Sequence, residues 1–170
     1  MNIKLITILA FLSISLTSVS QTYKIGYVKV ERVFSEWPET KKANKELQEY
    51  EAKLSSRLNA NVENFKMKVA AFTQNTSNMD DATKKDREAE LKNLQTQINQ
   101  FEANTVQSIK DKSLELLLPL QQMLKKAIEA VSRENGYTHI FDNVSFVFTT
   151  DSSGDISNKV ATKLGFTLSD

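Results

Sequence analysis

The sequence predicts an α+β protein that is mostly helical, with one long antiparallel helical hairpin set on a small β body. Apolar residues at helical spacing run through residues 40–118, a span that contains neither Gly nor Pro. Runs rich in β-branched and aromatic residues lie only before and after that span, at 23–30 and 137–150. Only 4 Gly and 2 Pro occur in the whole chain, which leaves little of it for loops.

The hairpin is predicted from apolar residues that recur every three or four positions. One stripe ascends from Ala43 to Phe72, and a second returns from Leu91 to Val131. Both average about 3.6 residues per step, against 3.5 for a strict heptad, so the two helices should be nearly straight and coiled-coil-like with little supercoil. The most turn-prone run places the tip near 75–81, where we expect Asn78 to cap the returning helix. The arm is therefore predicted over 40–118.

The first twenty residues are typical of a secretory signal peptide. Lys4 follows the start of the chain, an uncharged apolar run extends from Leu5 to Val19, and Ser18 and Ser20 are small residues at the −3 and −1 positions. A retained membrane anchor is the alternative, but the run is shorter than the ~20 residues that a span requires. We expect cleavage after Ser20 and exclude residues 1–20 from the fold.

Composition excludes several classes of function. Without Lys4 the 22 basic residues become 21, equal to the 21 acidic residues, and a neutral chain is not typical of a nucleic-acid binder. The chain has no Cys, and His139 is its only His, which excludes disulfides, His-based metal clusters and catalytic triads. No phosphate-binding loop or nucleophile elbow is present. We therefore predict no enzyme activity, no cofactor and no metal.

The body should comprise residues 21–39 and 119–170. We expect Trp37 to anchor the base of the arm by packing, and Pro119 to interrupt and kink the returning helix. Asn135 and Gly136 should end that helix. The remaining expected elements are a strand at 23–30, a helical turn at 31–34, strands at 137–142 and 145–150, and a helix at 156–164 capped by Asp155.

Three strands are too few to protect their own edges, so pairing between subunits is expected. The candidates for this oligomerisation are the bulky apolar residues of the predicted strands: Ile25, Tyr27, Val30, Ile140, Phe141, Phe146, Val147 and Phe148.

Several segments resemble the Skp/OmpH family of periplasmic chaperones, and their order and spacing cover essentially the whole mature chain. The matching segments are 24–28, the arm entry at 33–43, the return at 127–137, then 140–142 and 155–156. The resemblance implies a jellyfish-like homotrimer, in which an intersubunit β body carries three arms around a cavity. That cavity would hold unfolded outer-membrane β-barrel proteins and prevent their aggregation without ATP, with membrane contact only through these clients. One departure is the arm charge, because residues 41–112 hold 13 basic and 11 acidic residues and not the strongly basic arms of well-known members.

Contacts with clients are expected from apolar residues that lie off the hairpin stripes near the distal end. Met is adaptable at promiscuous surfaces, and the candidates are Met67, Ala70, Ala71 and Met79. A structural coiled-coil spacer or scaffold of the cell envelope is the alternative function, since it would share the helices without needing clients.

Overall fold

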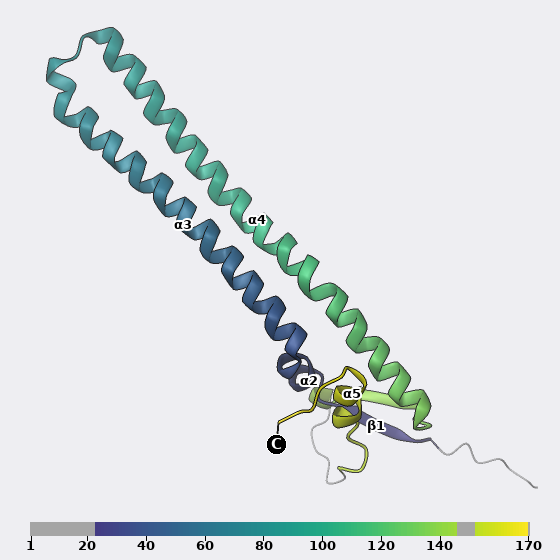
Figure 1. The fold of residues 1–170 in the computed structure, drawn as a ribbon. Helices are drawn as coiled ribbons and strands as arrows, with labels where there is room; N and C mark the ends of the chain where they lie inside the picture. The colour runs from purple at the N-terminus through teal and green to yellow at the C-terminus, as the bar shows by residue number, and fades with distance from the viewer. Residues whose placement is uncertain (1–22, 146–151, 170) are drawn as a thin grey trace, which may run out of the picture.

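In the computed structural model, residues 23–145 and 152–169 are described, and they form a long helical arm on a small body (Figure 1). The elements in chain order are β1 (Ile25–Val28), α2 (Val30–Glu36), α3 (Pro38–Asn75), η2 (Thr76–Asn78), α4 (Asp81–Glu134), β2 (His139–Asp142), η3 (Asn143–Ser145) and α5 (Ser157–Lys163). The predicted class, mostly helical with a small β component, is confirmed. The predicted signal peptide at 1–20 lies outside the described residues.

The arm consists of α3 and α4, which run side by side from the body to a tip at η2 (Figure 1). Every residue of both predicted stripes is buried or half-buried, from Ala43 to Phe72 and from Leu91 to Val131, and the last members of the returning stripe pack in the body. The stripes therefore form the seam of the hairpin, as expected. The predicted cap was wrong by two residues, because Asn78 belongs to η2. Asp80 caps α4 instead, and its carboxylate accepts a hydrogen bond of 2.7 Å from the backbone N–H of Thr83.

Pro119 does not interrupt the returning helix. Helix α4 continues through it to Glu134, so the expected interruption was wrong. The kink expected at Pro119 stays a prediction. The segment beyond Pro119 buries Leu124, Ala127 and Val131 in the body. Tertiary packing of these side chains outweighs the backbone hydrogen bond that proline removes, which costs about 3 kcal/mol within a helix. The chain breaks instead at Trp37, an extended residue that separates α2 from α3.

The sheet of the body pairs β1 with β2 in parallel, with Ile25 opposite His139 and Val28 opposite Asp142. Parallel strands need a crossover connection, and here α2 and the entire arm provide it. The other edge of β1 pairs with the segment before α5, since Tyr27 N–H donates to the carbonyl of Gly154 at 2.8 Å. The core between sheet and helices is formed by Val28, Val33, Leu124, Ala127, Val131, Ile156 and Val160.

The C-terminal part agrees with the prediction in its strand before Asn143 and in its final helix, but not at Ser145, which was expected in a strand. Residues 143–145 form a short 3-10 turn, and the rest of the strand predicted at 145–150 lies outside the described residues. The final helix begins at Ser157, one residue later than expected. The backbone N–H of Ser157 donates to the carboxylate of Asp155 at 2.9 Å, so Asp155 still stabilises the start of the helix. Gly136 and Gly165 have positive φ of 69° and 87° just after the ends of α4 and α5, a conformation that favours glycine.

Candidate functional site

The predicted client-binding residues lie at the distal end of the arm, where three of them are exposed and one is half-buried. Met67 is 60% exposed, and Ala70 and Ala71 are also exposed. Met79 is half-buried and meets Ala71 across a small hollow of about 290 Å³. Ion pairs surround this hollow, because the carboxylate of Glu90 accepts hydrogen bonds from Lys68 and Arg87, and these hold the pKa of Glu90 below its usual range. The tip therefore combines a small apolar surface, at Ala71 and Met79, with charged side chains that are held in ion pairs.

The predicted oligomerisation residues divide into exposed and buried groups. Ile25 and Phe141 are 55% and 43% exposed, whereas Tyr27 is buried within the chain. Val30 and Ile140 are half-buried, and Val30 begins α2, so its expected place in a strand was wrong. Three of the predicted residues, Phe146, Val147 and Phe148, lie outside the described residues. In the single chain, the side chains of Ile25 and Phe141 are therefore exposed where a second subunit could contact them.

Exposed rings extend this surface of the sheet. The ring of His139 lies between those of Tyr23 and Phe141, with centroid distances of 6.0 and 6.5 Å. The Nδ1 atom of His139 is 3.2 Å from the hydroxyl oxygen of Thr138. The rings of Tyr23, His139 and Phe141 thus form a row, tilted at the first contact and stacked at the second, on this side of the body.

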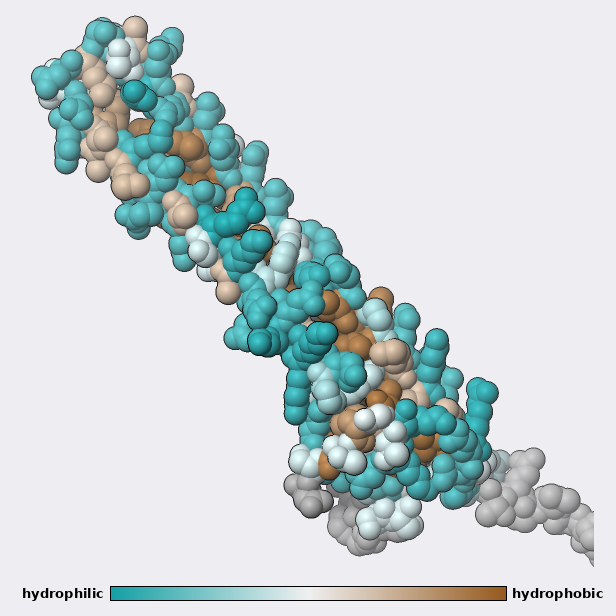
Figure 2. Space-filling view, viewed as in Figure 1, coloured by the Kyte–Doolittle hydropathy of each residue, from teal (hydrophilic) through white to brown (hydrophobic). Residues whose placement is uncertain are grey.

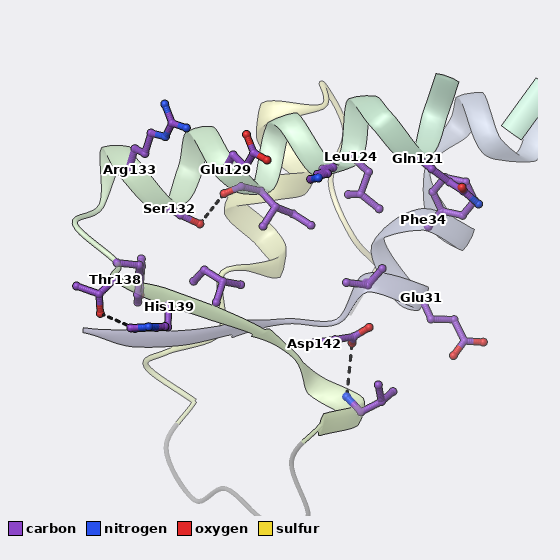
Figure 3. A pocket seen from close by; sticks show the side chains of 16 residues that line it. Glu31, Phe34, Gln121, Leu124, Glu129, Ser132, Arg133, Thr138, His139 and Asp142 are labelled. Atoms are coloured by element: carbon purple, nitrogen blue, oxygen red, sulfur yellow. Dashed lines mark hydrogen bonds between the residues drawn. The ribbon is translucent and has the colours of Figure 1, made fainter. Parts of the chain in front are cut away.

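A groove of about 760 Å³ lies between α2, the last turns of α4 and β2 (Figure 3). Its lining is largely apolar and includes Val30, Phe34, Leu124, Ile128 and Ile140. Charged side chains form the rim, with Glu31 on α2 and Glu129 and Arg133 on α4 (Figure 3). A wide apolar floor with a mixed charged rim is suited to an apolar segment of a macromolecule.

An exposed apolar face of α4 was missed by the sequence reasoning. Val106, Leu114 and Leu118 are 68%, 52% and 48% exposed, although they lie on the arm close to the body. Hydrophobic residues are visible at the surface along this lower half of the arm and again near the tip (Figure 2). The signal was the leucine-rich run at 114–118, which contains more leucines than one seam can bury, since only Leu116 and the later Leu120 belong to the stripe.

The end of the chain fixes α2 in place. The carboxylate of Glu36 accepts hydrogen bonds from the backbone N–H and hydroxyl of Ser169, at 2.8 and 2.6 Å, and from Nε of Arg32 at 2.9 Å. The two bonds from Ser169, aided by Arg32, lower the pKa of Glu36 from its ordinary 4.5 to about 2. This carboxylate therefore has a structural role beside the break at Trp37.

The described part of the chain contains neither a candidate metal site nor a candidate membrane-spanning helix. Residues 23–145 and 152–169 contain no group of three or more His, Cys, Asp or Glu placed to hold a metal ion. None of the helices within those ranges is both long enough and apolar enough to cross a membrane.

The fold and these surfaces define a helical-hairpin protein that presents a long arm and open apolar surfaces from a small α+β body. The chain belongs to the family described as "Outer membrane protein (OmpH-like)", whose family model matches residues 24–164 and so includes the arm and both parts of the body. The resemblance noted in the sequence is thereby confirmed.

A solved structure supports the same fold. The chain is similar to the crystal structure of a proposed outer membrane chaperone (OmpH-like) from Caulobacter crescentus CB15, with a TM-score of 0.76. The sequences are 13% identical, and the match covers 84% of this chain and 83% of that chain. At this identity the likeness shows the fold alone. No curated protein sequence matches this chain.

Proposed function

We propose that the mature chain is a periplasmic holdase chaperone that binds unfolded outer-membrane β-barrel proteins and prevents their aggregation without ATP. Membership of the OmpH-like family supports a chaperone role, as does a fold shared with a protein proposed to be an outer membrane chaperone. The observation that carries the proposal is the exposed apolar surface of α4, at Val106, Leu114 and Leu118, next to an apolar groove of about 760 Å³. Exposed apolar patches of this kind are typical of surfaces that contact other macromolecules.

The working form is a homotrimer in this proposal. A two-stranded sheet is marginal on its own, and Ile25 and Phe141 leave apolar area open on the body. Closed symmetry would repeat the same contact in each subunit and leave no open sheet edge. Three bodies joined in this way would direct three arms around a shared space.

The mechanism needs many weak contacts and no chemistry. An unfolded membrane barrel exposes apolar strands and unpaired sheet edges, which aggregate in water. Three arms make each further contact intramolecular, so modest affinities combine while each contact still exchanges quickly. Release follows when the client folds into the membrane and no longer presents these surfaces. ATP has no role in such a cycle.

The proposal is tested by diluting a urea-unfolded membrane barrel into buffer with and without the purified mature protein, in the absence of ATP. We expect light scattering from aggregates to fall as the protein approaches stoichiometric amounts. A structural spacer of the cell envelope would leave the scattering unchanged, and this result would overturn the proposed function.

A further inference from the structure

Helix α4 carries two apolar faces, and α3 covers only one of them. The seam face includes Ile109, Leu116 and Leu120. A second face follows positions three or four residues apart, which lie on one side of a helix. We define the second face as Val106, Lys110, Leu114, Leu117, Leu118, Gln121, Lys125 and Ile128. Its members in the arm are exposed, except for Leu117, which is half-buried.

The second face is continuous with the groove of the body. Gln121, Lys125 and Ile128 belong to the face and also line the groove beside β2 (Figure 3). A segment lying along α4 could therefore pass from the apolar arm residues into the apolar groove across the side chains of Gln121 and Lys125. Brown hydrophobic surface follows this lower half of the arm toward the body (Figure 2).

The length of the face matches one strand of a membrane β-barrel. From Val106 to Ile128 the helix rises by about 33 Å at 1.5 Å per residue. A transmembrane β-strand has about 9–11 residues, and an extended chain advances about 3.3 Å per residue, so such a strand spans about 30–36 Å. One extended strand would thus cover the face from end to end.

The charge of the face further restricts which segments can bind there. It contains Lys110 and Lys125 but no carboxylate. Neither lysine forms an ion pair with a residue that the structure describes. The arm part of the face therefore suits an apolar segment that is neutral or carries an isolated Asp or Glu. The groove sets no such preference, because Glu31, Glu129 and Asp142 line it together with Lys125 and Arg133. This local charge was hidden by the near balance of 13 basic and 11 acidic residues over 41–112.

We propose that the second face of α4 binds one extended apolar strand of an unfolded membrane β-barrel, with one end of that strand in the groove. The inference rests on the proposed chaperone function and assigns capture to the base of the arm, whereas sequence reasoning placed it near Met67 and Met79. A second copy of the chain competes for the groove, because Val30 and Ile140 line it and are also candidates for the contact between subunits. The arm part of the face is a weaker contact between copies, since a stable protein interface involves about 20–30 residues on each side and this part is a single row broken by Lys110 and Gln121.

The test compares a double variant of the second face with a matched variant of the tip. Leu114→Gln with Leu118→Gln changes two exposed positions, and Met67→Gln with Ala71→Gln changes two exposed positions at the distal end. Gln has nearly the helix propensity of the residues it replaces, so both proteins should keep the fold, which circular dichroism checks. The probe is a urea-unfolded eight-stranded membrane barrel, titrated by fluorescence. We expect the apparent Kd to rise at least tenfold, or about 1.4 kcal/mol, for the face variant and less than twofold for the tip variant.

The absence of Cys permits a direct map of the contact. A photo-crosslinker attached to Gln121→Cys should capture the unfolded barrel, while one attached to Lys85→Cys at the tip should capture much less. Equal affinities for both double variants, or capture mainly from position 85, would overturn the inference while the proposed function stands. A changed mass of the face variant in sedimentation would identify a contact between copies and would also overturn it. Failure of the unaltered protein to bind the barrel would remove the proposed function itself.

Discussion

Glu46 and Lys112 face each other across the arm, with 2.9 Å between Oε1 of Glu46 and Nζ of Lys112. Hydrogen bonds to Glu46 and Glu115 raise the pKa of Lys112. The ion pair between Lys68 and Glu90, much nearer the tip, has residue numbers with the same total of 158. The pairing register is therefore uniform along the hairpin, and it places Pro119 opposite position 39.

This register brings two irregularities to the same level. Pro119 supplies no N–H to the carbonyl of Glu115, and on the facing side the chain breaks between α2 and α3 at Trp37. Buried polar atoms accompany the break, since Nε1 of Trp37 and Oγ1 of Thr40 have no hydrogen-bond partner among the described residues. The base of the arm thus combines a missing backbone donor in α4 with two unpartnered side-chain atoms beside the start of α3.

Replacing Pro119 should stabilise the protein. Pro119→Ala restores one backbone donor within α4 and is expected to raise the free energy of unfolding by about 1–3 kcal/mol, measured by urea denaturation at a fixed protein concentration. Pro38→Ala is the matched control. Pro38 lies in the first turn of α3, where no N–H partner is needed, so its change should be within about 0.5 kcal/mol. Equal effects of both substitutions would contradict this account.

Gly26 should not tolerate a methyl group. A Cβ atom at this position would lie 2.7 Å from Cε1 of Tyr137 and 2.9 Å from the carbonyl oxygen of Gly154. Gly26→Ala must therefore displace backbone, and we expect a loss of about 1–3 kcal/mol in urea denaturation, as for other overpacked cores. Gly154→Ala meets its nearest atom only at 3.4 Å and should cost less. A larger loss of stability for Gly154→Ala than for Gly26→Ala would contradict the close approach of Tyr137 and Gly154 to Gly26.

The contribution of Glu36 to stability should depend on pH. Its pKa of about 2 in the folded chain lies below the ordinary 4.5, so the unfolded chain binds more protons between these values. The stabilisation is therefore complete above about pH 4.5 and is lost as the pH falls toward 2. Glu36→Gln should be less stable than the unaltered protein at pH 7, and the difference should shrink on acidification to pH 3.

Glu31→Gln provides the control for this prediction. Glu31 is exposed on the same helix, and the structure records no ion pair for it with the described residues. This variant exchanges a carboxylate for an amide on the same helix, so its denaturation at several pH values controls for the loss of one charge from α2. A Glu36 difference that stays constant from pH 7 to pH 3 would show that its bonds to Ser169 and Arg32 are absent in solution.

Assembly should depend on the exposed apolar residues of the sheet. Ile25→Asp would place an unpaired carboxylate in the proposed contact between subunits, at a cost of several kcal/mol. Closed symmetry repeats this cost in every subunit. We expect sedimentation to report a trimer for the unaltered protein and smaller species for the variant, with helical circular dichroism retained because Ile25 is 55% exposed. An Asn93→Asp control on the exposed side of the arm should stay trimeric.

The signal peptide prediction is tested by mass spectrometry of cell-envelope fractions. We expect the mature chain to begin at Gln21, because the small residues Ser18 and Ser20 precede that position. Recovery of residues 5–15 in the membrane fraction would indicate a retained anchor instead.

The sequence by itself determined the arm, the class of fold and the family resemblance. A hairpin seam is a local property, since apolar residues three or four positions apart share a helix face whatever surrounds them. For this reason every stripe residue from Ala43 to Val131 is found in the seam or the core. The stops at Gly136 and Gly165 were equally readable, because a positive φ favours glycine wherever it occurs.

Tertiary structure decided what depends on neighbours distant in the sequence. Pro119 remains helical because Leu124 and Val131 are buried against β1, α2 and α5, contacts that a local helix rule does not include. The second face of α4 is visible only once α3 has covered the other face and left Leu114 and Leu118 exposed. The same holds for Glu36, whose partner Ser169 lies 133 positions away. Local spacing fixes which residues are apolar and helical, whereas packing decides which of them remain open to a partner.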